Sequence, residues 1–454
     1  MHKSLWFTTT LSCVLLGFTS GCSLLNSSSS TSSQSGNQNP VNAIAAIKKP
    51  ELPLIVAPEN PDPIINAKAL QYVKSLAPHG SPQQSHGIWI QSDDKLLANH
   101  LGTTPVTAAS ISKVATTLAT LKTLGAEHVF VTQIGTTGAI ENGVIKGDLV
   151  IQGGEDAFFV SEEAIALGNT LNQMGIKQIT GDLIITGKFY MNFSRNPSTV
   201  GNLLKMGLNN QTWNPGFINA HKSLPPETPK PQVIINGKVK TLPTVPANFK
   251  LLVRHNSYPL AELLKKMNNF SNNAMAEMLA DSVGGAKVVA QKAATAAEVP
   301  QNEIYLVNGS GLTYANKISP RAAIAMFRAI EKHLQQQNMT VADVFTVIGQ
   351  DGGILKPRGI PKLAVVKSGS LDNTSALIGA LPTQNRGTVW FAIMNFSGNL
   401  VQFRKRQDTF LTSLVNEWGT VTIPPPELTP NPARKNKISQ SEIIGTQQPA
   451  VTNQ

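Results

Sequence analysis

Residues Pro105–Gly125, PVTAASISKVATTLATLKTLG, predict one amphipathic helix, and this helix sets the first constraint on the fold. The apolar face of the helix carries Val114, Leu118 and Leu121. Ser110 and Lys113 stand one turn apart at its start, so their side chains share a face near the N-terminus. Ser110 is therefore either a helix cap or a nucleophile with its base one turn away, and other parts of the chain must decide between the two.

The N-terminal residues 1–22, MHKSLWFTTTLSCVLLGFTSGC, predict a signal peptide. Lys3 gives a basic start, the following apolar run is too short to span a bilayer stably, and small residues precede Cys22. This ending resembles a bacterial lipoprotein processing site, at which Cys22 would become the lipidated first residue. Simple cleavage nearby, releasing a soluble protein, is the alternative. We expect an exported protein of the periplasm or cell envelope, anchored to the membrane as a lipoprotein.

Two further terminal segments lack the pattern of a packed structure. Residues 23–58 begin with SLLNSSSSTSSQSGNQNP, which is rich in Ser, Gly and Asn and predicts a disordered tether. Residues 420–454 are rich in Pro and Gln and predict a disordered tail. A long tether of this kind suits a domain held away from a membrane.

Cysteine content and charge exclude several classes of function. Cys13 lies inside the predicted signal and Cys22 at its end, so the mature domain has no cysteine pair for a disulfide or a Cys-ligated zinc. The formal net charge is +11, but the Lys and Arg residues are scattered and form no block interleaved with aromatics. We therefore expect no nucleic-acid partner, and an exported basic protein is better suited to anionic envelope polymers.

The central sequence indicates two nested units. HGIWIQ and KLLANH predict a strand pair ahead of the Ser110 helix, which places residues 59–128 in the first part of the main domain. IKGDLVIQGG and ITGDLIITG then repeat Gly-Asp-Leu inside β-branched runs and predict two similar strands around a helix, EEAIALGNTLNQMG. We assign residues 129–245 to an inserted small α+β domain and expect loops and edges from about Asn192 to Pro246, which are rich in Asn, Pro and Gly.

Residues 246–419 predict the second part of the main domain. YPLAELLKKMNNFSNNAMAEMLADSV has two apolar stripes separated by SNN, and another helical pattern follows Pro320. KLAVVKSGS and VWFAIMNF have strand composition. In the main domain the helical patterns come first and the strand patterns last, and the inserted unit interrupts them. This order indicates an α/β (α+β) sandwich with a mainly antiparallel sheet.

Three short motifs stand in a fixed order along this domain. Ser110 and Lys113 form S-x-x-K, Ser271 and Asn273 form S-x-N between two helices, and Lys367-Ser368-Gly369 forms K-S-G on a predicted strand. Each motif alone has a plain structural explanation, a cap for the first two and a strand end for the third. Their order and structural contexts together favour one serine-based active site.

A serine hydroxyl needs a base within reach and a site for the oxyanion. Lys113 can take the proton of Ser110 if burial and a second cation, for which Lys367 is the candidate, lower its pKa. Ser271 can relay a proton to a leaving amine, and the amide of Asn273 can hold the backbone of a substrate. The strand of Lys367-Ser368-Gly369 lets a peptide add as an extra strand, with Gly369 allowing close approach.

The flanking sequences resemble the class C low-molecular-mass penicillin-binding proteins, the D-alanyl-D-alanine carboxypeptidase/endopeptidase family. The resemblance runs from about Gly87 to about Glu417 and is carried by ASISKVATTLATLKTLG, GDLVIQGGEDAFF, MNNFSNNAMAEML, LVNGSGLTYANKISPRA and VVKSGSLDNTSALIGAL. Three departures are visible: the insert is short for the family, GGEDAF replaces the usual GGGDP, and Asn308 replaces a usual Asp.

The resemblance implies a penicillin-binding-protein/β-lactamase-like transpeptidase fold. It implies catalytic roles for Ser110, Lys113 and Ser271, and an oxyanion hole formed by the N–H groups of Ser110 and Ser370. It implies that substrate is bound by the residues Asn273, Ser310, Gly311, Leu312, Lys367, Ser368, Gly369 and Ser370, of which Lys367 and Ser368 take the terminal carboxylate. No metal or cofactor is implied.

The implied partners are peptidoglycan stem peptides ending in D-Ala-D-Ala, with β-lactams as inhibitors. A class A β-lactamase uses an E-x-x-x-L-x-N stretch for deacylation, and the match in this chain, Glu163–Asn169, lies in the helix EEAIALGNTLNQMG of the predicted insert. Two questions stay open at the level of sequence. One is whether the enzyme is a carboxypeptidase or also an endopeptidase, and the other is whether the chain is instead a non-catalytic, lipid-anchored cell-wall-binding protein on the same fold.

Overall fold

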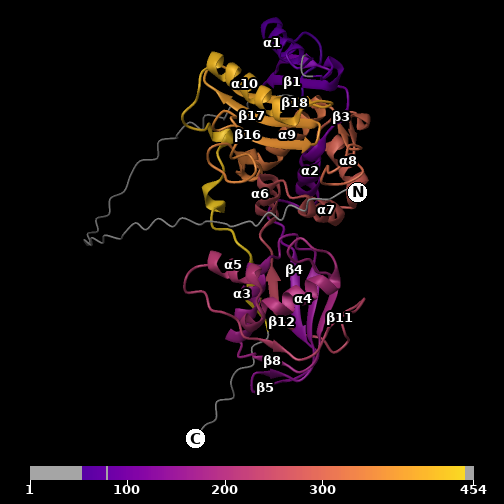
Figure 1. The fold of residues 1–454 in the computed structure, drawn as a ribbon, viewed down its shortest axis with the longest axis vertical. Helices are drawn as coiled ribbons and strands as arrows, with labels where there is room; N and C mark the ends of the chain where they lie inside the picture. Colours follow the sequence, from indigo (N-terminus) through magenta and orange to yellow (C-terminus); the bar gives the residue numbers. More distant parts are fainter. Residues whose placement is uncertain (1–53, 78–79, 445–454) are drawn as a thin grey trace, which may run out of the picture.

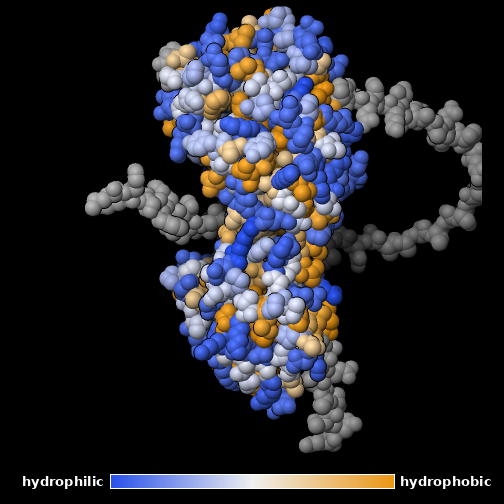
Figure 2. Space-filling model, turned by 90° about the vertical axis from the view of Figure 1, so that its right-hand side faces the viewer, coloured by the Kyte–Doolittle hydropathy of each residue, from blue (hydrophilic) through white to orange (hydrophobic). Residues whose placement is uncertain are grey.

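The computed structural model describes residues 54–77 and 80–444. The predicted signal peptide, Cys22 and most of the predicted tether lie outside these residues, as do residues 445–454. The described part forms two lobes joined at a narrower waist (Figures 1 and 2). No helix within it is both long and apolar enough to cross a membrane.

The upper lobe in Figure 1 is built on one antiparallel sheet. In spatial order its strands are β15 (Thr346–Val347), β16 (Val365–Leu371), β17 (Thr374–Thr383), β18 (Gly387–Asn395), β1 (His86–Ser92) and β2 (Lys95–His100). The predicted strand pair is confirmed as β1 and β2, and the predicted strands KLAVVKSGS and VWFAIMNF become β16 and β18.

Helices cover both faces of this sheet. On one face, α1 (Pro63–Lys74) and α10 (Leu400–Trp418) share an apolar core with Val366 and Leu377. On the other face, Val365 and Ile378 pack in the core of a helical layer. That layer consists of α2 (Ser112–Leu124), α6 (Leu260–Phe270), α7 (Asn273–Ser282), α8 (Gly285–Ala296) and α9 (Pro320–Gln335). A short sheet of β13 (Ile304–Tyr305), β14 (Lys317–Ile318) and β3 (Val106–Thr107) lies beside it.

The second lobe is the inserted α+β domain. Its larger sheet has the order β11 (Val239–Thr241), β9 (Leu183–Lys188), β7 (Leu149–Gly154), β4 (Val131–Thr136), β12 (Lys250–Asn256) and β19 (Gln440–Ile443). The two Gly-Asp-Leu repeats start parallel neighbours, with Leu149 opposite Leu183, and α3 (Ser161–Gln173) connects them. The smaller sheet contains β10 (Ile234–Ile235), β8 (Gln178–Ile179), β6 (Val144–Ile145) and β5 (Ile140–Glu141).

The insert is larger than predicted and more helical. Because β12 belongs to its sheet, the insert continues to Asn256 instead of ending at residue 245. Residues 192–246, expected to be loops and edges, contain α4 (Pro197–Gly207) and α5 (Pro215–Ser223). Both helices begin with an Asn cap followed by Pro, a strong start signal that composition alone conceals.

The ends of the main domain also differ from prediction. Leu54 and Val56 pack in its core, so residues 54–58 do not belong to the tether. The predicted disordered tail is wrong for residues 420–444, because Leu428 is fully buried and β19 pairs with β12. Pairing with β19 covers the N–H and C=O groups that β12 would otherwise leave at a sheet edge.

Candidate active site

Ser110 lies in a tight 3-10 turn, η3 (Ala109–Ile111), directly ahead of α2. The N-cap of α2 is Ile111, and no side chain caps the helix, so Ser110 is not a cap. Ala109 has a positive φ of 46°, which is unfavourable for a residue with a Cβ. Ser112 Oγ donates to Ala109 O at 2.9 Å, and a Cβ at Gly311 would overlap that carbonyl. The surroundings therefore hold this strained turn in place.

Lys113 is fully buried on the first turn of α2. Its Nζ lies 2.9 Å from Ser110 Oγ, 2.7 Å from Asn273 Oδ1 and 2.7 Å from Ser310 O. Burial lowers the pKa of Lys113 to about 7, against the opposing effect of the Glu277 carboxylate. Lys113 can therefore lose its proton near neutral pH.

The same three contacts suit an ammonium, which donates to all of them, and a neutral amine, which is the form that can act as a base. Asn273 Oδ1 and Ser310 O accept hydrogen bonds from Lys113, which uses both N–H groups of a neutral amine. The remaining lone pair faces Ser110 Oγ, whose hydroxyl can donate to it. Lys113 is thus placed as a proton acceptor for Ser110.

Ser271 and Asn273 lie at the junction of α6 and α7. Ser271 ends α6 in the left-handed region, with φ 49°. Asn272 is the N-cap of α7 and accepts from Met275 N at 3.0 Å. Because Asn272 serves as the cap, the side chains of Ser271 and Asn273 point to other partners, Lys367 and Lys113.

Lys367 brings the third motif to the same point. Its Nζ donates to Ser271 Oγ at 3.0 Å and to Ser368 O at 2.6 Å, and its side chain is fully buried. Burial, followed by the charge of Lys113, holds the pKa of Lys367 well below its usual range. We expected burial and the charge of Lys367 to lower the pKa of Lys113 together, and burial is the main cause of the lowering.

The β16 strand presents an open edge beside Ser110. β15 pairs only with Val365 and Val366, so no strand within the described residues pairs with that edge from Lys367 onward. A Cβ at Gly369 would lie 2.8 Å from Ala108 O and 3.0 Å from Ser110 N, so glycine allows the close approach. Leu371 and Thr374 close a two-residue turn. By alternation along the ladder, the N–H of Ser370 points to the open edge.

The segment Ser310-Gly311-Leu312 forms the other wall. Glu277 accepts from Gly309 N and Ser310 N, both at 2.9 Å, and so fixes the carbonyl that contacts Lys113. Asn308 Oδ1 accepts from Gly311 N at 2.9 Å, a contact that an Asp could make equally. Leu312 is largely exposed at the rim.

Comparison with known proteins identifies the family. The D-Ala-D-Ala carboxypeptidase 3 (S13) family matches residues 71–211 and 219–412, which is most of the chain. The chain belongs to the S13 peptidase family. A curated relative, the D-alanyl-D-alanine carboxypeptidase DacB of Haemophilus influenzae, is 23% identical over 398 residues, covering 65% of this chain and 81% of the relative.

Solved structures of similar proteins share the fold of this S13 peptidase. Penicillin binding protein 4 (dacB) from Haemophilus influenzae has a TM-score of 0.57 at 20% identity, covering 77% of this chain and 99% of that one. The predatory endopeptidase Bd0816 from Bdellovibrio bacteriovorus has a TM-score of 0.64 at 21% identity, covering 78% and 99%. The predicted penicillin-binding-protein/β-lactamase-like fold with an added domain is confirmed.

The structure of this S13 peptidase brings every motif residue of the predicted site together around Ser110 and adds two that the sequence analysis missed. Glu277 lies one turn after Asn273 on α7, so helical spacing could have placed it on the same face. Arg404 on α10 donates to Ser370 Oγ at 2.9 Å. No local sequence signal links Arg404 to the site, because sheet packing alone brings α10 to β16.

The insert's GGEDAF segment does not present its Asp to a ligand. Asp156 is buried, and its Oδ1 accepts from Phe158 N at 2.8 Å within a turn. Glu155, at a position where the family usually has Gly, has a positive φ of 71° and pairs with Lys188 at 2.8 Å.

Proposed function

We propose that this chain is a serine-type D-alanyl-D-alanine carboxypeptidase that acts on peptidoglycan stem peptides through an acyl-enzyme at Ser110. The observation that carries the proposal is the set of contacts of Lys113, which leaves a lone pair facing Ser110 Oγ at 2.9 Å when the amine is neutral. Membership of the S13 family supports the proposal, as does the name of the Haemophilus relative.

Acylation would begin with attack of Ser110 Oγ on the carbonyl carbon of the penultimate D-Ala. Lys113 takes the hydroxyl proton as the C–O bond forms. The N–H groups of Ser110 and Ser370 would stabilise the oxyanion, since Gly369 lets β16 lie next to Ser110 N.

Release of the terminal D-Ala breaks the C–N bond and needs a proton on the leaving amine. Ser271 Oγ can supply it and be reprotonated through Lys367 Nζ, 3.0 Å away, or Lys113. Water then hydrolyses the ester, and Ser110 regains its proton. In a β-lactam the leaving amine stays attached to the acyl group, so the adduct with Ser110 should persist.

Labelled benzylpenicillin tests the proposal directly. We expect one covalent adduct per chain, and mass spectrometry should place it on the peptide containing Ser110. Ser110→Ala should abolish the adduct and keep the thermal unfolding temperature close to that of the wild type. Folded wild-type protein that forms no adduct would favour the non-catalytic cell-wall-binding alternative.

A DD-endopeptidase activity is a second candidate, because the same acyl-enzyme could release a cross-linked amine. A similar structure, Bd3459 from Bdellovibrio bacteriovorus, is a predatory peptidoglycan endopeptidase, which makes the test worthwhile. Incubation with cross-linked and uncross-linked peptidoglycan fragments, followed by product identification, separates the two activities. Release of free D-Ala alone would assign the chain as a carboxypeptidase.

We also propose export and lipid anchoring through Cys22. Wild-type protein expressed with residues 1–22 should partition into the detergent phase, and Cys22→Ala should move it to the aqueous phase. A wild-type protein that already partitions as soluble would contradict the anchor.

A further inference from the structure

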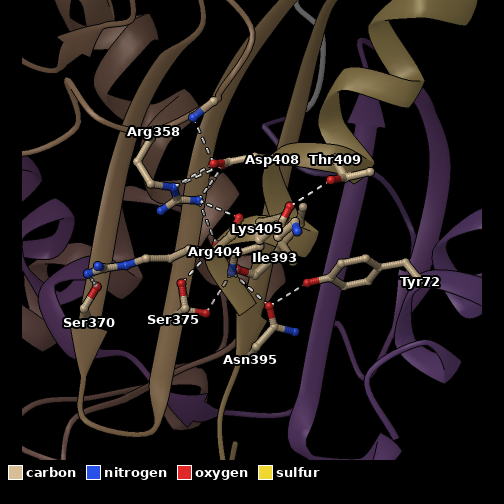
Figure 3. Close-up of polar contacts among 12 residues, drawn as sticks. Tyr72, Arg358, Ser370, Ser375, Ile393, Asn395, Arg404, Lys405, Asp408 and Thr409 are labelled. Atoms are coloured by element: carbon tan, nitrogen blue, oxygen red, sulfur yellow. Dashed lines mark hydrogen bonds and ion pairs between the residues drawn. The ribbon is translucent and has the colours of Figure 1, made fainter. Parts of the chain in front are cut away.

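A polar network connects α10 to the active-site strand. Figure 3 shows Arg404 extending from α10 to Ser370 on β16, beside the pair of Arg358 and Asp408. Arg404 Nη2 donates to Ser370 Oγ at 2.9 Å. This contact occupies the acceptor side of the Ser370 hydroxyl and leaves its proton free to donate to a ligand.

The two faces of β16 carry different groups. Val365 packs in the core of the helical layer and Val366 in the core of α1 and α10. By strand alternation, Lys367 and Gly369 share the face of Val365, and Ser370 shares the face of Val366. Ser370 therefore lies on the α10 side of the open edge, next to Arg404.

Lys367 is poorly suited to supply the charge for a substrate carboxylate. Its side chain is 1% exposed, and its amine is hydrogen-bonded to Ser271 Oγ and Ser368 O. Its pKa is held well below the usual range by burial and by the charge of Lys113. An enclosed amine whose donors are already engaged is poorly placed to reach a carboxylate.

Arg404 has the opposite properties. It is half-buried, an arginine stays protonated in proteins, and no carboxylate in the described residues forms an ion pair with it. The nearby Asp408 is taken by Arg358, through Nε at 3.0 Å and Nη2 at 2.7 Å. Asp408 therefore neutralises Arg358, and the positive charge of Arg404 is left beside Ser370.

We propose that Arg404, together with the hydroxyl of Ser370, binds the terminal α-carboxylate of the peptide substrate. This inference rests on the proposed carboxypeptidase function and reassigns the charged contact that resemblance gave to Lys367. A peptide lying along the open edge of β16 places its C-terminus near Ser370 on the α10 side. The guanidinium uses one N–H on Ser370 and keeps others for the carboxylate.

The test compares one peptide in two forms, a diacylated L-Lys-D-Ala-D-Ala with a free carboxylate and the same peptide with a C-terminal amide. The measured quantity is the ratio of kcat/KM for the acid to kcat/KM for the amide. Both peptides are measured with the same preparation of each variant, so a loss of folded or active enzyme lowers both values equally and leaves the ratio unchanged. We expect wild type to prefer the acid, and Arg404→Gln to reduce that preference by about 30-fold.

Two variants serve as comparisons. Lys405→Gln removes an exposed charge from the next residue of α10 and should leave the ratio unchanged. Arg404→Lys keeps the charge without the planar fork and should restore part of the preference.

The outcomes separate the two proposals. If wild type cleaves neither peptide, the proposed function fails and this inference fails with it. If wild type cleaves the acid form and Arg404→Gln keeps the wild-type ratio, the inference is overturned and the carboxypeptidase function stands. A wild type that does not distinguish acid from amide would also overturn the inference.

Discussion

At the scale of single residues, the structure predicts that Lys113 must be able to lose its proton. Arginine keeps its positive charge in proteins, so Lys113→Arg removes the base from Ser110 while preserving the cation. Penicillin acylation should fall about 1,000-fold or more, as measured by the rate of adduct formation. Lys122→Arg, an exposed change on the same helix, should acylate like wild type. Near-normal acylation by Lys113→Arg would make Lys113 a structural cation and Ser110 dependent on another base.

A second prediction concerns the pH dependence of acylation. Only neutral Lys113 accepts the proton, and its pKa is about 7, so the acylation rate should rise with pH and level off above about pH 7. The Glu277 carboxylate raises the pKa of Lys113, so Glu277→Gln should move the midpoint of this profile to lower pH. Asp281→Asn, a more exposed change one turn further along α7, is the matched control. An upward shift for Glu277→Gln would show that loss of its contacts to Gly309 and Ser310 dominates.

At the scale of elements, β16 approaches the Ser110 turn closely at Gly369. A methyl group at position 369 would lie 2.8 Å from Ala108 O and 3.0 Å from Ser110 N, and neither backbone atom can rotate away. Gly369→Ala should therefore keep the fold but lower the acylation rate about 10-fold or more, as measured with labelled penicillin. Gly352→Ala, where an added Cβ meets nothing within 4 Å, should have no effect. Equal rates for both variants would argue against an oxyanion hole between Ser110 and Ser370.

Helices and strands with a clear apolar periodicity could be predicted from the sequence. Elements and contacts that depend on packing between distant segments could not. The helices carrying S-x-x-K and S-x-N and the strand carrying K-S-G were predictable because each combines a regular apolar pattern with turn residues. α4 and α5 were missed because Asn-Pro was interpreted as a loop signal, although it also starts helices. β19 and the contact between Arg404 and Ser370 depend on packing between distant segments, for which a single sequence carries no local pattern.

At the scale of the whole molecule, the segment 420–444 acts as a strap across both lobes. It begins in the core of the main domain at Leu428 and ends as β19 in the sheet of the insert. Between these points, Arg434 pairs with Glu127 and with Glu262, at 2.8 and 2.7 Å from the latter. In sequence, Glu127 lies just before the insert and Glu262 just after it. Arg434 therefore links the two segments that join the insert to the main domain.

Arg434→Gln should therefore weaken the contacts between the segments that join the two lobes. Arg434 is 8% exposed and the side chain of Glu262 is 17% exposed, so the variant leaves a mostly buried carboxylate without its charged partner. We expect the free energy of unfolding to fall by about 2 kcal/mol, measured by urea denaturation.

Penicillin acylation should change little, because no motif residue contacts Arg434, whereas cleavage of polymeric peptidoglycan should decline if the insert must be held beside the site. Lys437→Gln is the matched control, since Lys437 and Glu127 are 38% and 54% exposed and such pairs contribute at most about 1 kcal/mol. Equal destabilisation by the two variants would mean that the strap is held by β19 and Leu428 and that Arg434 does not clamp the waist.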